Sequence, residues 1–197
     1  MHRDNTKPFH SHSKIIVEIG SGDGRLISNL ASLYHVDDNV LFIGIEVDEI
    51  QYGKSCTQIK RGNVQFINDK FERVLASFPD ETVDTVISVL PHPDYIDRTH
   101  QQKWAPDYKV ILDKMKPCGN FILVTEITDE LFEPVSISDY EDWKRWVVET
   151  FGLIGFDVAK VMDGAPLYFS SHYLDKFKND PQRIKIITLI LAKKKTT

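Results

Sequence analysis

Seven short apolar runs alternate along this chain with segments whose apolar positions lie three or four residues apart. Short apolar runs are typical of buried strands, and the three-to-four spacing is typical of helices packed on one face. The runs predict strands at 14–19, 40–46, 64–67, 83–90, 120–125, 155–161 and 183–192. The intervening segments predict helices at 24–34, 48–60, 70–78, 106–115 and 138–151.

The regular alternation of strand and helix predicts an α/β fold, with a mostly parallel sheet covered by helices on both faces. The last two strands have no long helix between them, so we expect an antiparallel hairpin at the edge of a seven-stranded sheet. Asp48 and Ser138 are residue types that cap helix N-termini, and the Lys-Pro-Cys-Gly segment at 116–119 is a stop signal. We expect a polar tail at 1–13 and a single domain at 14–197.

The first predicted strand runs directly into a glycine-rich turn. Its spacing is E-x-G-x-G-x-G from position 18 to position 24, and Arg25 follows where a nicotinamide or flavin site would need its third glycine. Glycines let backbone N–H groups and a helix N-terminus approach a ligand closely. We expect a cofactor-binding loop formed by Glu18, Gly20, Ser21, Gly22 and Gly24. The alternative is a purely structural turn.

Polar side chains also follow the second and third predicted strands. Glu46 ends an apolar run about twenty residues after the last glycine, where doubly wound folds hold ribose hydroxyls with an acid. The alternative role for Glu46 is to cap the helix that begins near Asp48. Asn68 and Asp69 end the third strand, where they could read an adenine amino group. The three strand ends predict one pocket outside the carboxyl edge of the sheet.

The composition is that of an ordinary globular domain: 197 residues, 42% hydrophobic and 27% charged. No apolar run approaches the roughly twenty residues of a membrane helix, and the polar start of the chain has no signal-peptide pattern. Cys56 and Cys118 are too few for a disulfide scaffold, which favours a reducing, cytoplasmic location. We interpret His10 and His12 as exposed residues of the tail and expect no metal site.

Two stretches break the periodicity, at 90–105 and at 162–181. Long connections without periodicity inside a compact domain are often functional. The formal net charge of -5 argues against a nucleic-acid partner, although net charge does not exclude local basic patches. Basic residues gather at 144–145 and between 176 and 195, either as an interaction surface or as a solvated face.

The glycine loop resembles the S-adenosylmethionine loop of Rossmann-like methyltransferases, and two further segments resemble the tRNA (guanine-N7)-methyltransferase family. Pro-Asp-Tyr at 106–108 is similar to the Pro-acid-aromatic helix start of that family, and Ser-His-Tyr-Leu-Asp-Lys-Phe at 171–177 to its Thr-x-Tyr-Glu-x-Lys-Phe signature. The resemblance implies the class I methyltransferase fold, S-adenosyl-L-methionine as cofactor and methylation of guanine N7 in tRNA. It also implies an RNA partner and no membrane, and leaves monomer and homodimer open.

The Pro-Asp-Pro-Trp motif of that family falls on a divergent segment. Aligned without a gap, its Pro-Asp-Pro lies on 91–93 and puts His92 at the catalytic aspartate position. Shifted by two residues, Pro93 and Asp94 supply the aspartate instead. We expect Asp94 or His92 to take this role, with the chemistry favouring Asp94. Elsewhere the acid after the fifth strand is Glu126, and Leu174 replaces the signature glutamate.

Guanine N7 carries an in-plane lone pair and no proton, so its methylation depends on positioning and on exclusion of water more than on a base. Carboxylates suit the N–H groups of the base, and basic side chains suit phosphates. On these grounds and on the resemblance, we expect the substrate to contact Arg98, Lys103, Glu126, Ser171, Tyr173 and Lys176. Tyr95, Trp104 and Tyr173 could stack on a flipped base. The alternative for Trp104 is the buried face of a helix that it shares with Tyr108.

The sequence is also compatible with two other functions. One is methylation of ribosomal RNA or of a small molecule on the same fold, which the acidic net charge and the thinned basic run favour. The other is a non-catalytic partner protein that binds the cofactor but has lost methyl transfer. His92 and Leu174, at substrate-side positions, motivate this second alternative.

Overall fold

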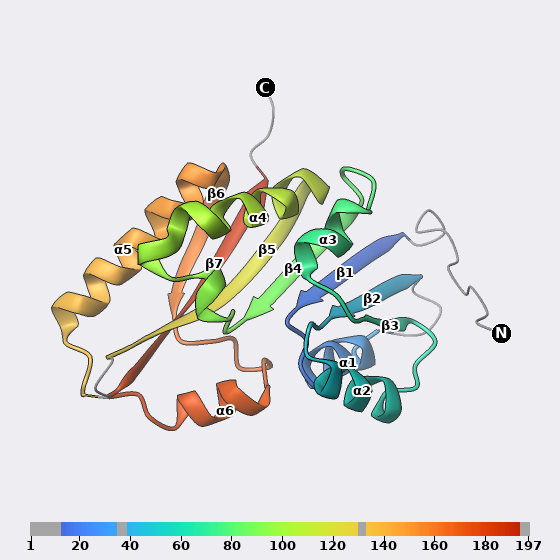
Figure 1. Cartoon of the computed structure of the whole chain (residues 1–197), viewed down its shortest axis with the longest axis horizontal. Coiled ribbons are helices and arrows are strands. Elements are labelled where there is room, and N and C mark those ends of the chain that lie inside the picture. Colours follow the sequence, from blue (N-terminus) through green and yellow to red (C-terminus); the bar gives the residue numbers. More distant parts are fainter. Residues whose placement is uncertain (1–12, 35–38, 130–132, 194–197) are drawn as a thin grey trace.

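The computed structural model describes residues 13–34, 39–129 and 133–193 and shows a seven-stranded sheet in the order β3-β2-β1-β4-β5-β7-β6 (Figure 1). The strands are β1 (Lys14–Ile19), β2 (Val40–Ile45), β3 (Val64–Ile67), β4 (Val83–Val89), β5 (Met115–Thr128), β6 (Phe156–Asp163) and β7 (Ile184–Lys193). The helices are α1 (Arg25–Ser32), α2 (Glu49–Gln58), α3 (Phe71–Ala76), α4 (Gln101–Lys114), α5 (Ile137–Ile154) and α6 (His172–Lys178). Two 3₁₀ turns, η3 (Pro93–Tyr95) and η4 (Arg98–His100), follow β4.

Strands β3, β2, β1, β4 and β5 are parallel, whereas β7 runs antiparallel to both β5 and β6. The predicted seven-stranded sheet with an antiparallel edge hairpin is therefore confirmed. The strand order reverses beside β1, because β2 and β3 lie on one side of it and β4 on the other. In open α/β sheets this switch point opens a crevice at the carboxyl ends of the strands.

Two hydrophobic clusters pack on opposite faces of the sheet. The larger cluster holds the buried side chains of α3, α4 and α5, and Figure 1 shows these three helices over the same face. The second cluster holds the buried side chains of α1 and α6. Val17 belongs to the first cluster and Ile16 to the second, because successive side chains of a strand point to opposite faces. Helices therefore hold β1 from both sides and fix the loop that follows it.

The helix predictions need three corrections. α4 begins at Gln101 instead of at 106, and Pro106 lies inside it, because packing of the buried Trp104 and Tyr108 outweighs the missing N–H of the proline. α5 is capped by Ser136, whose Oγ accepts the N–H of Asp139 (3.1 Å), and not by Ser138. α6 was not predicted, because seven residues carry too little periodicity. The predicted cap of α2 is confirmed, since Asp48 accepts the N–H of Gln51 at 2.9 Å.

The stop signal at 116–119 lies inside a strand. β5 begins at Met115, not at 120, and its pairing with β4 shifts register between Val83 and Thr85. Cys118 takes a left-handed φ of 68° in the segment of β5 at this shift. Among the helices of the described ranges, none combines the length and the apolar character needed to cross a membrane. Of the expected N-terminal tail, only Ser13 belongs to the described residues.

Candidate active site

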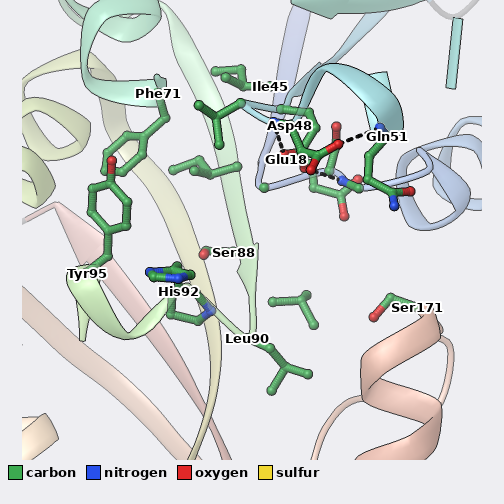
Figure 2. Close-up of a pocket in the computed structure, with 18 of the residues that line it drawn as sticks. Glu18, Ile45, Asp48, Gln51, Phe71, Ser88, Leu90, His92, Tyr95 and Ser171 are labelled. Carbon is green, nitrogen blue, oxygen red and sulfur yellow. Dashed lines mark hydrogen bonds between the residues drawn. The ribbon is translucent and has the colours of Figure 1, made fainter. Parts of the chain in front are cut away.

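A cavity of about 910 Å³ lies at the carboxyl ends of β1, β2 and β4, where the strand order reverses (Figure 2). Its walls come from the glycine loop, the end of β2, the start of α3, the segment after β4, the end of β5 and the start of α6. The volume is within the range of small-molecule sites. The cavity thus brings together segments that are far apart in the sequence.

The glycine loop faces the cavity with bare backbone. A Cβ added to Gly22, whose φ is 54°, would meet no heavy atom within 4 Å. The N–H groups of the loop are used within the protein: Gly20 and Ser21 donate to the carbonyl of Ile45 (2.9 and 3.0 Å), and Gly22 donates to Glu46 Oε2 (2.7 Å). The loop therefore offers close approach to a ligand, and most of its N–H groups are already occupied.

Gly24 has a packing role. It caps α1 with a φ of 76° and does not line the cavity. A Cβ at this position would lie 2.6 Å from the ring of Phe66 and 2.7 Å from the side chain of Ile59. The third glycine of the motif therefore lets α1 approach β3 and α2, which the spacing alone did not distinguish from a ligand contact.

Glu18 ties β1 to α1 across the loop. Its side chain is 3% exposed, it lines the cavity, and its Oε2 accepts the N–H of Ile27 at 3.0 Å. Burial raises the pKa of Glu18 well above its ordinary value, and the nearby carboxylates of Asp23 and Glu46 raise it further. One hydrogen bond to the first turn of α1 lowers the pKa but does not offset the burial.

Glu46 lies at the end of β2 and is 8% exposed. Its two oxygens accept the N–H of Gly22 (2.7 Å) and the N–H of Asp48 (2.8 Å). Each oxygen keeps a second lone pair for a ligand hydroxyl. The neighbouring Ser21 Oγ is buried in the cavity wall without a hydrogen-bond partner in the described part of the chain. Both side chains can therefore hydrogen-bond a polar ligand.

Only one of the two polar residues after β3 faces the cavity. Asn68 donates its side-chain amide to the carbonyls of Glu46 (2.8 Å) and Val47 (3.2 Å), and does not line the cavity. It holds the ends of β2 and β3 together. Asp69 does line the cavity, and its Oδ1 accepts the N–H of Lys70 at 2.7 Å.

His92 and Asp94 both lie at the cavity, on the segment after β4. The N–H of Asp94 donates to His92 Nδ1 (3.3 Å), and Nδ1 is 3.4 Å from Asp94 Oδ2. Both side chains are largely exposed, so the structure brings both candidates for the catalytic position to the site. Tyr95 also lines the cavity, and burial raises its pKa to about 12.

Glu126, near the end of β5, faces the same cavity from another wall. Its Oε2 is buried and has no hydrogen-bond partner among the described residues. Burial raises the pKa of this carboxyl to about 7, and its own backbone N–H lowers it slightly. Glu126 is therefore poised between its neutral and ionised forms near neutral pH.

The start of α6 adds two predicted residues to the cavity. Ser171 caps α6 by accepting the N–H of Leu174 (3.3 Å), and Tyr173 lies exposed on the rim. Lys176 lies outside the lining, with its Nζ 5.9 Å from the centre of the Tyr173 ring. Leu174 is fully buried in the second cluster, so this departure from the signature is explained by packing.

Three other predicted residues do not reach the cavity. Arg98 is ion-paired with Asp142 on α5, at 2.8 Å from Nη1 to Oδ2. Lys103 is an exposed residue of α4. The prediction that Trp104 stacks on a base is wrong: it is 1% exposed and donates its Nε1–H to the carbonyl of Asp97 (2.8 Å).

The cavity also contains residues that the sequence did not single out, among them Lys54, Lys70, Ser88, Leu90 and His172. Ser88 could have been predicted as a site residue, because it is a polar residue within an apolar run of its strand. Leu90 carried none, because only the structure reveals its left-handed φ of 54°. In the described ranges, no group of His, Cys, Asp and Glu is arranged to hold a metal, and His10 and His12 lie outside those ranges.

The fold is shared with solved structures over nearly its whole length. The 16S rRNA methyltransferase KamB superposes with a TM-score of 0.70 at 11% identity, over 94% of this chain and 90% of that chain. A 16S rRNA (adenine(1408)-N(1))-methyltransferase from Catenulisporales acidiphilia, solved with S-adenosylmethionine, superposes with a TM-score of 0.65 at 14% identity, over 95% and 88%. At such identities the likeness concerns the fold.

The fold is that of the class I S-adenosylmethionine-dependent methyltransferases, and the residues of the cavity fit this cofactor. The bare backbone at Gly22, the unpartnered hydroxyl of Ser21 and the acceptor oxygens of Glu46 are what a nucleoside with a polar tail requires. A family model described as "Putative methyltransferase" matches residues 12–150. The chain belongs to this methyltransferase family.

Curated relatives carry more specific names. A tRNA (guanine-N(7)-)-methyltransferase of Thermotoga maritima is 26% identical over 167 residues, which are 81% of this chain and 48% of the relative. A second protein of that name, from Lactobacillus gasseri, is 32% identical over 142 residues, which are 67% of this chain and 63% of the relative. The chain thus spans about half to two thirds of the length of these relatives.

Proposed function

We propose that this protein transfers a methyl group from S-adenosylmethionine to N7 of a guanine in tRNA. The observation that carries the proposal is a single cavity that joins the glycine loop and Glu46 to His92, Asp94 and Glu126. The names of the relatives support tRNA and guanine N7. A tRNA substrate would place the protein in the cytoplasm.

On the cofactor side, the bare backbone of Gly20 and Gly22 would let the methionine moiety approach the loop. Glu46 would accept hydrogen bonds from the ribose hydroxyls, and Asp69 would accept one from the adenine amino group. When bound, the cofactor supplies a methyl group on a positively charged sulfur. Glu18 would act indirectly, by holding the loop against α1.

On the substrate side, the chain has to orient the base and exclude water, because guanine N7 has a lone pair and no proton to remove. Glu126, with a buried oxygen that lacks a partner, would accept from an N–H group of the base. Tyr173 offers an exposed ring at the rim on which a base could stack. Lys176, beside that ring, would contact a phosphate without reading sequence.

The test uses tritiated S-adenosylmethionine and an unmodified tRNA transcript, followed by digestion to nucleosides. We expect labelled 7-methylguanosine. A matched transcript with 7-deazaguanosine in place of guanosine should take no label, since it lacks N7. Label in the deaza transcript would move the target to another atom, and no label in either, with cofactor binding retained in calorimetry, would reject tRNA.

A second candidate is methyl transfer to another RNA or to a small molecule. The observation that favours it is the placement of Arg98 and Lys103, which lie away from the cavity, with Arg98 paired to Asp142. The same assay with ribosomal RNA fragments distinguishes it from the first proposal. Cofactor binding without label in any RNA would favour a small-molecule substrate or a non-catalytic partner protein.

A further inference from the structure

We infer that His92 is a specificity-determining hydrogen-bond donor, which presents its Nε2–H to an acceptor atom of the substrate base. The inference rests on the proposed function and deepens it, because it states which kind of base atom this wall of the cavity reads. On the edge of guanine that carries N7, the acceptor beside N7 is O6. Figure 2 shows His92 in the cavity wall, on the segment that follows Leu90.

The hydrogen bond to the ring favours one tautomer. The backbone N–H of Asp94 donates to His92 Nδ1 at 3.3 Å, so this nitrogen acts as an acceptor. A neutral imidazole whose Nδ1 accepts carries its proton on Nε2. With the proton on Nδ1 instead, two N–H groups would point at each other across the same 3.3 Å. Asp94 Oδ2 lies 3.4 Å from the same Nδ1, a contact that would become an ion pair if the ring were protonated.

The backbone around His92 is rigid. Leu90 holds a left-handed φ of 54°, which costs a leucine about 1–2 kcal/mol and persists only where the surrounding structure enforces it. The N–H of Leu90 donates to the carbonyl of Val124 at 2.8 Å, which extends the pairing of β4 with β5 by one residue. Pro91 and Pro93 fix the backbone on either side of His92.

The η3 turn after His92 also restrains this residue. The carbonyl of His92 accepts the N–H of Tyr95 at 2.8 Å, and its ring caps the start of η3 by accepting the N–H of Asp94. Both hydrogen bonds leave Nε2 unused. A strained residue, two prolines and a capped turn thus hold one donor at the cavity. Ordered donors of this kind discriminate well, because an incorrect base leaves them unpaired.

The N–H donor of His92 complements the carboxylate acceptors that also line the cavity. Glu126 and Asp94 present carboxylate oxygens to the cavity, whereas His92 presents an N–H. Guanine offers acceptors at N7 and O6 and donors at N1–H and N2–H₂. One donor beside carboxylate acceptors therefore suits guanine, and the pairing of His92 with O6 would keep N7 free for the methyl group.

Two measurements test the inference. The first is the long-range ¹H–¹⁵N spectrum of the whole protein labelled with ¹⁵N-histidine at pH 8.5, with the His92 signal assigned by its loss in His92→Gln. We expect the Nε2–H tautomer, and an Nδ1–H tautomer would overturn the inference. This readout does not depend on turnover, so the position of the proton is tested even if the wild-type protein methylates no tRNA, a result that would contradict the proposed function.

The second measurement compares three variants of similar length on the tRNA transcript. His92→Gln keeps a donor, whereas His92→Met and His92→Glu have none, and His92→Met adds no charge. We expect kcat/KM of His92→Met and His92→Glu to fall at least about tenfold below that of His92→Gln, with the cofactor Kd unchanged. Equal rates for His92→Gln and His92→Met would overturn the role of the donor.

A change in the substrate separates the contact with O6 from a structural role. Synthetic tRNA with 2-aminopurine at the methylated position keeps N7 but lacks O6 and the N1–H. The loss of N1–H affects the wild type and His92→Met alike, so it cancels in the ratio of their rates. If His92 donates to O6, the ratio of the wild-type rate to the His92→Met rate should approach one on this substrate. The same ratio as on guanine would show that His92→Met acts through the loop and would overturn the inference.

Discussion

Two carboxylates at the carboxyl edge of the sheet, those of Glu18 and Glu46, accept hydrogen bonds from backbone N–H groups of the protein itself. Glu18 accepts an N–H of α1, and Glu46 accepts the N–H groups of Gly22 and Asp48. Glu46 contacts the residue before α2 by accepting the N–H of Asp48, but Asp48 itself caps that helix. Glu46 also lines the cavity, where its ribose role stays a proposal. Removing its charge should consequently affect the loop as well as the ligand.

We predict that Glu46→Gln weakens binding of S-adenosylmethionine at least about tenfold and lowers the free energy of unfolding by about 1–3 kcal/mol. The amide places an NH₂ group where a backbone N–H now needs an acceptor. Calorimetry and urea unfolding measure the two effects. Glu49→Gln, an exposed residue of α2, is the control and should change neither. Unchanged affinity in Glu46→Gln would contradict the ribose assignment.

Glu126 makes stability depend on pH. Its folded pKa of about 7 lies above the ordinary value of 4.5, so the unfolded chain loses the proton first as the pH rises. The free energy of unfolding contributed by this group is therefore highest below pH 4.5 and is lost between pH 4.5 and 7. Glu18 acts in the same direction, because its pKa is also raised.

We predict that Glu126→Gln reduces the loss of stability between pH 5 and pH 8 by about 1–3 kcal/mol. Urea unfolding of the wild type and the variant at both pH values measures the difference. Glu18 is present in both proteins, so its contribution cancels in the comparison. Identical pH dependence in the two proteins would show that Glu126 ionises normally in the fold.

At the scale of elements, Gly22 and Gly24 of the glycine loop have different roles: Gly22 faces the cavity, whereas Gly24 packs against neighbouring side chains. We predict that Gly24→Ala lowers the free energy of unfolding by about 2–4 kcal/mol, since its Cβ would overlap Phe66 and its φ is left-handed. Gly22→Ala adds only the backbone strain and should cost about 1–2 kcal/mol. Urea unfolding ranks the two. Gly53→Ala, in open space within α2, should instead stabilise by about 0.5–1 kcal/mol.

The start of α5 gives a second matched pair. Ser136 Oγ accepts the N–H of Asp139 and also donates to its carboxylate (2.6 Å), whereas Ser138 is an exposed residue within the helix. We predict that Ser136→Ala lowers the free energy of unfolding by about 0.5–2 kcal/mol and that Ser138→Ala is neutral or slightly stabilising. The reverse order in urea unfolding would restore Ser138 as the cap.

For the whole molecule, ion pairing limits how a polyanion can bind. Many of its basic side chains are already paired, such as Arg98 with Asp142 and Lys144 with Asp163. Six cations near the cavity or on α4 and α6 form no ion pair within the described ranges: Lys54, Lys70, Lys103, Lys109, Lys176 and Lys178. Binding of tRNA, if this is the substrate, should therefore depend only moderately on salt.

We predict a slope of about -2 to -4 when the logarithm of the tRNA association constant is plotted against the logarithm of the salt concentration. Filter binding between 50 and 200 mM salt would measure it. Lys176→Gln should reduce the slope by about 0.7–0.9, because one phosphate contact is lost. Lys160→Gln, exposed on the edge strand β6, is the control. A slope near -8 would require a basic surface that these residues do not provide.

The sequence by itself determined the order of strands and helices, because the period of the apolar positions reports which face of each element is buried. It also determined the glycine loop and Glu46, since chain order brings the ends of neighbouring parallel strands to one edge. The bounds of the short elements were harder to predict. α6 and the first turn of α4 are held by tertiary contacts of Leu174 and Trp104 with the two hydrophobic clusters.

Only the tertiary structure decided which members of each motif face the cavity. Gly24 and Asn68 follow the sequence pattern of the site, yet one packs under α1 and the other joins two strand ends. The left-handed backbone of Leu90 and the acceptor role of His92 Nδ1 arise from contacts with Val124 and Asp94 in the folded chain. The direction of each side chain depends on such contacts between distant segments, so residue type and spacing in the sequence could not predict which residues face the cavity.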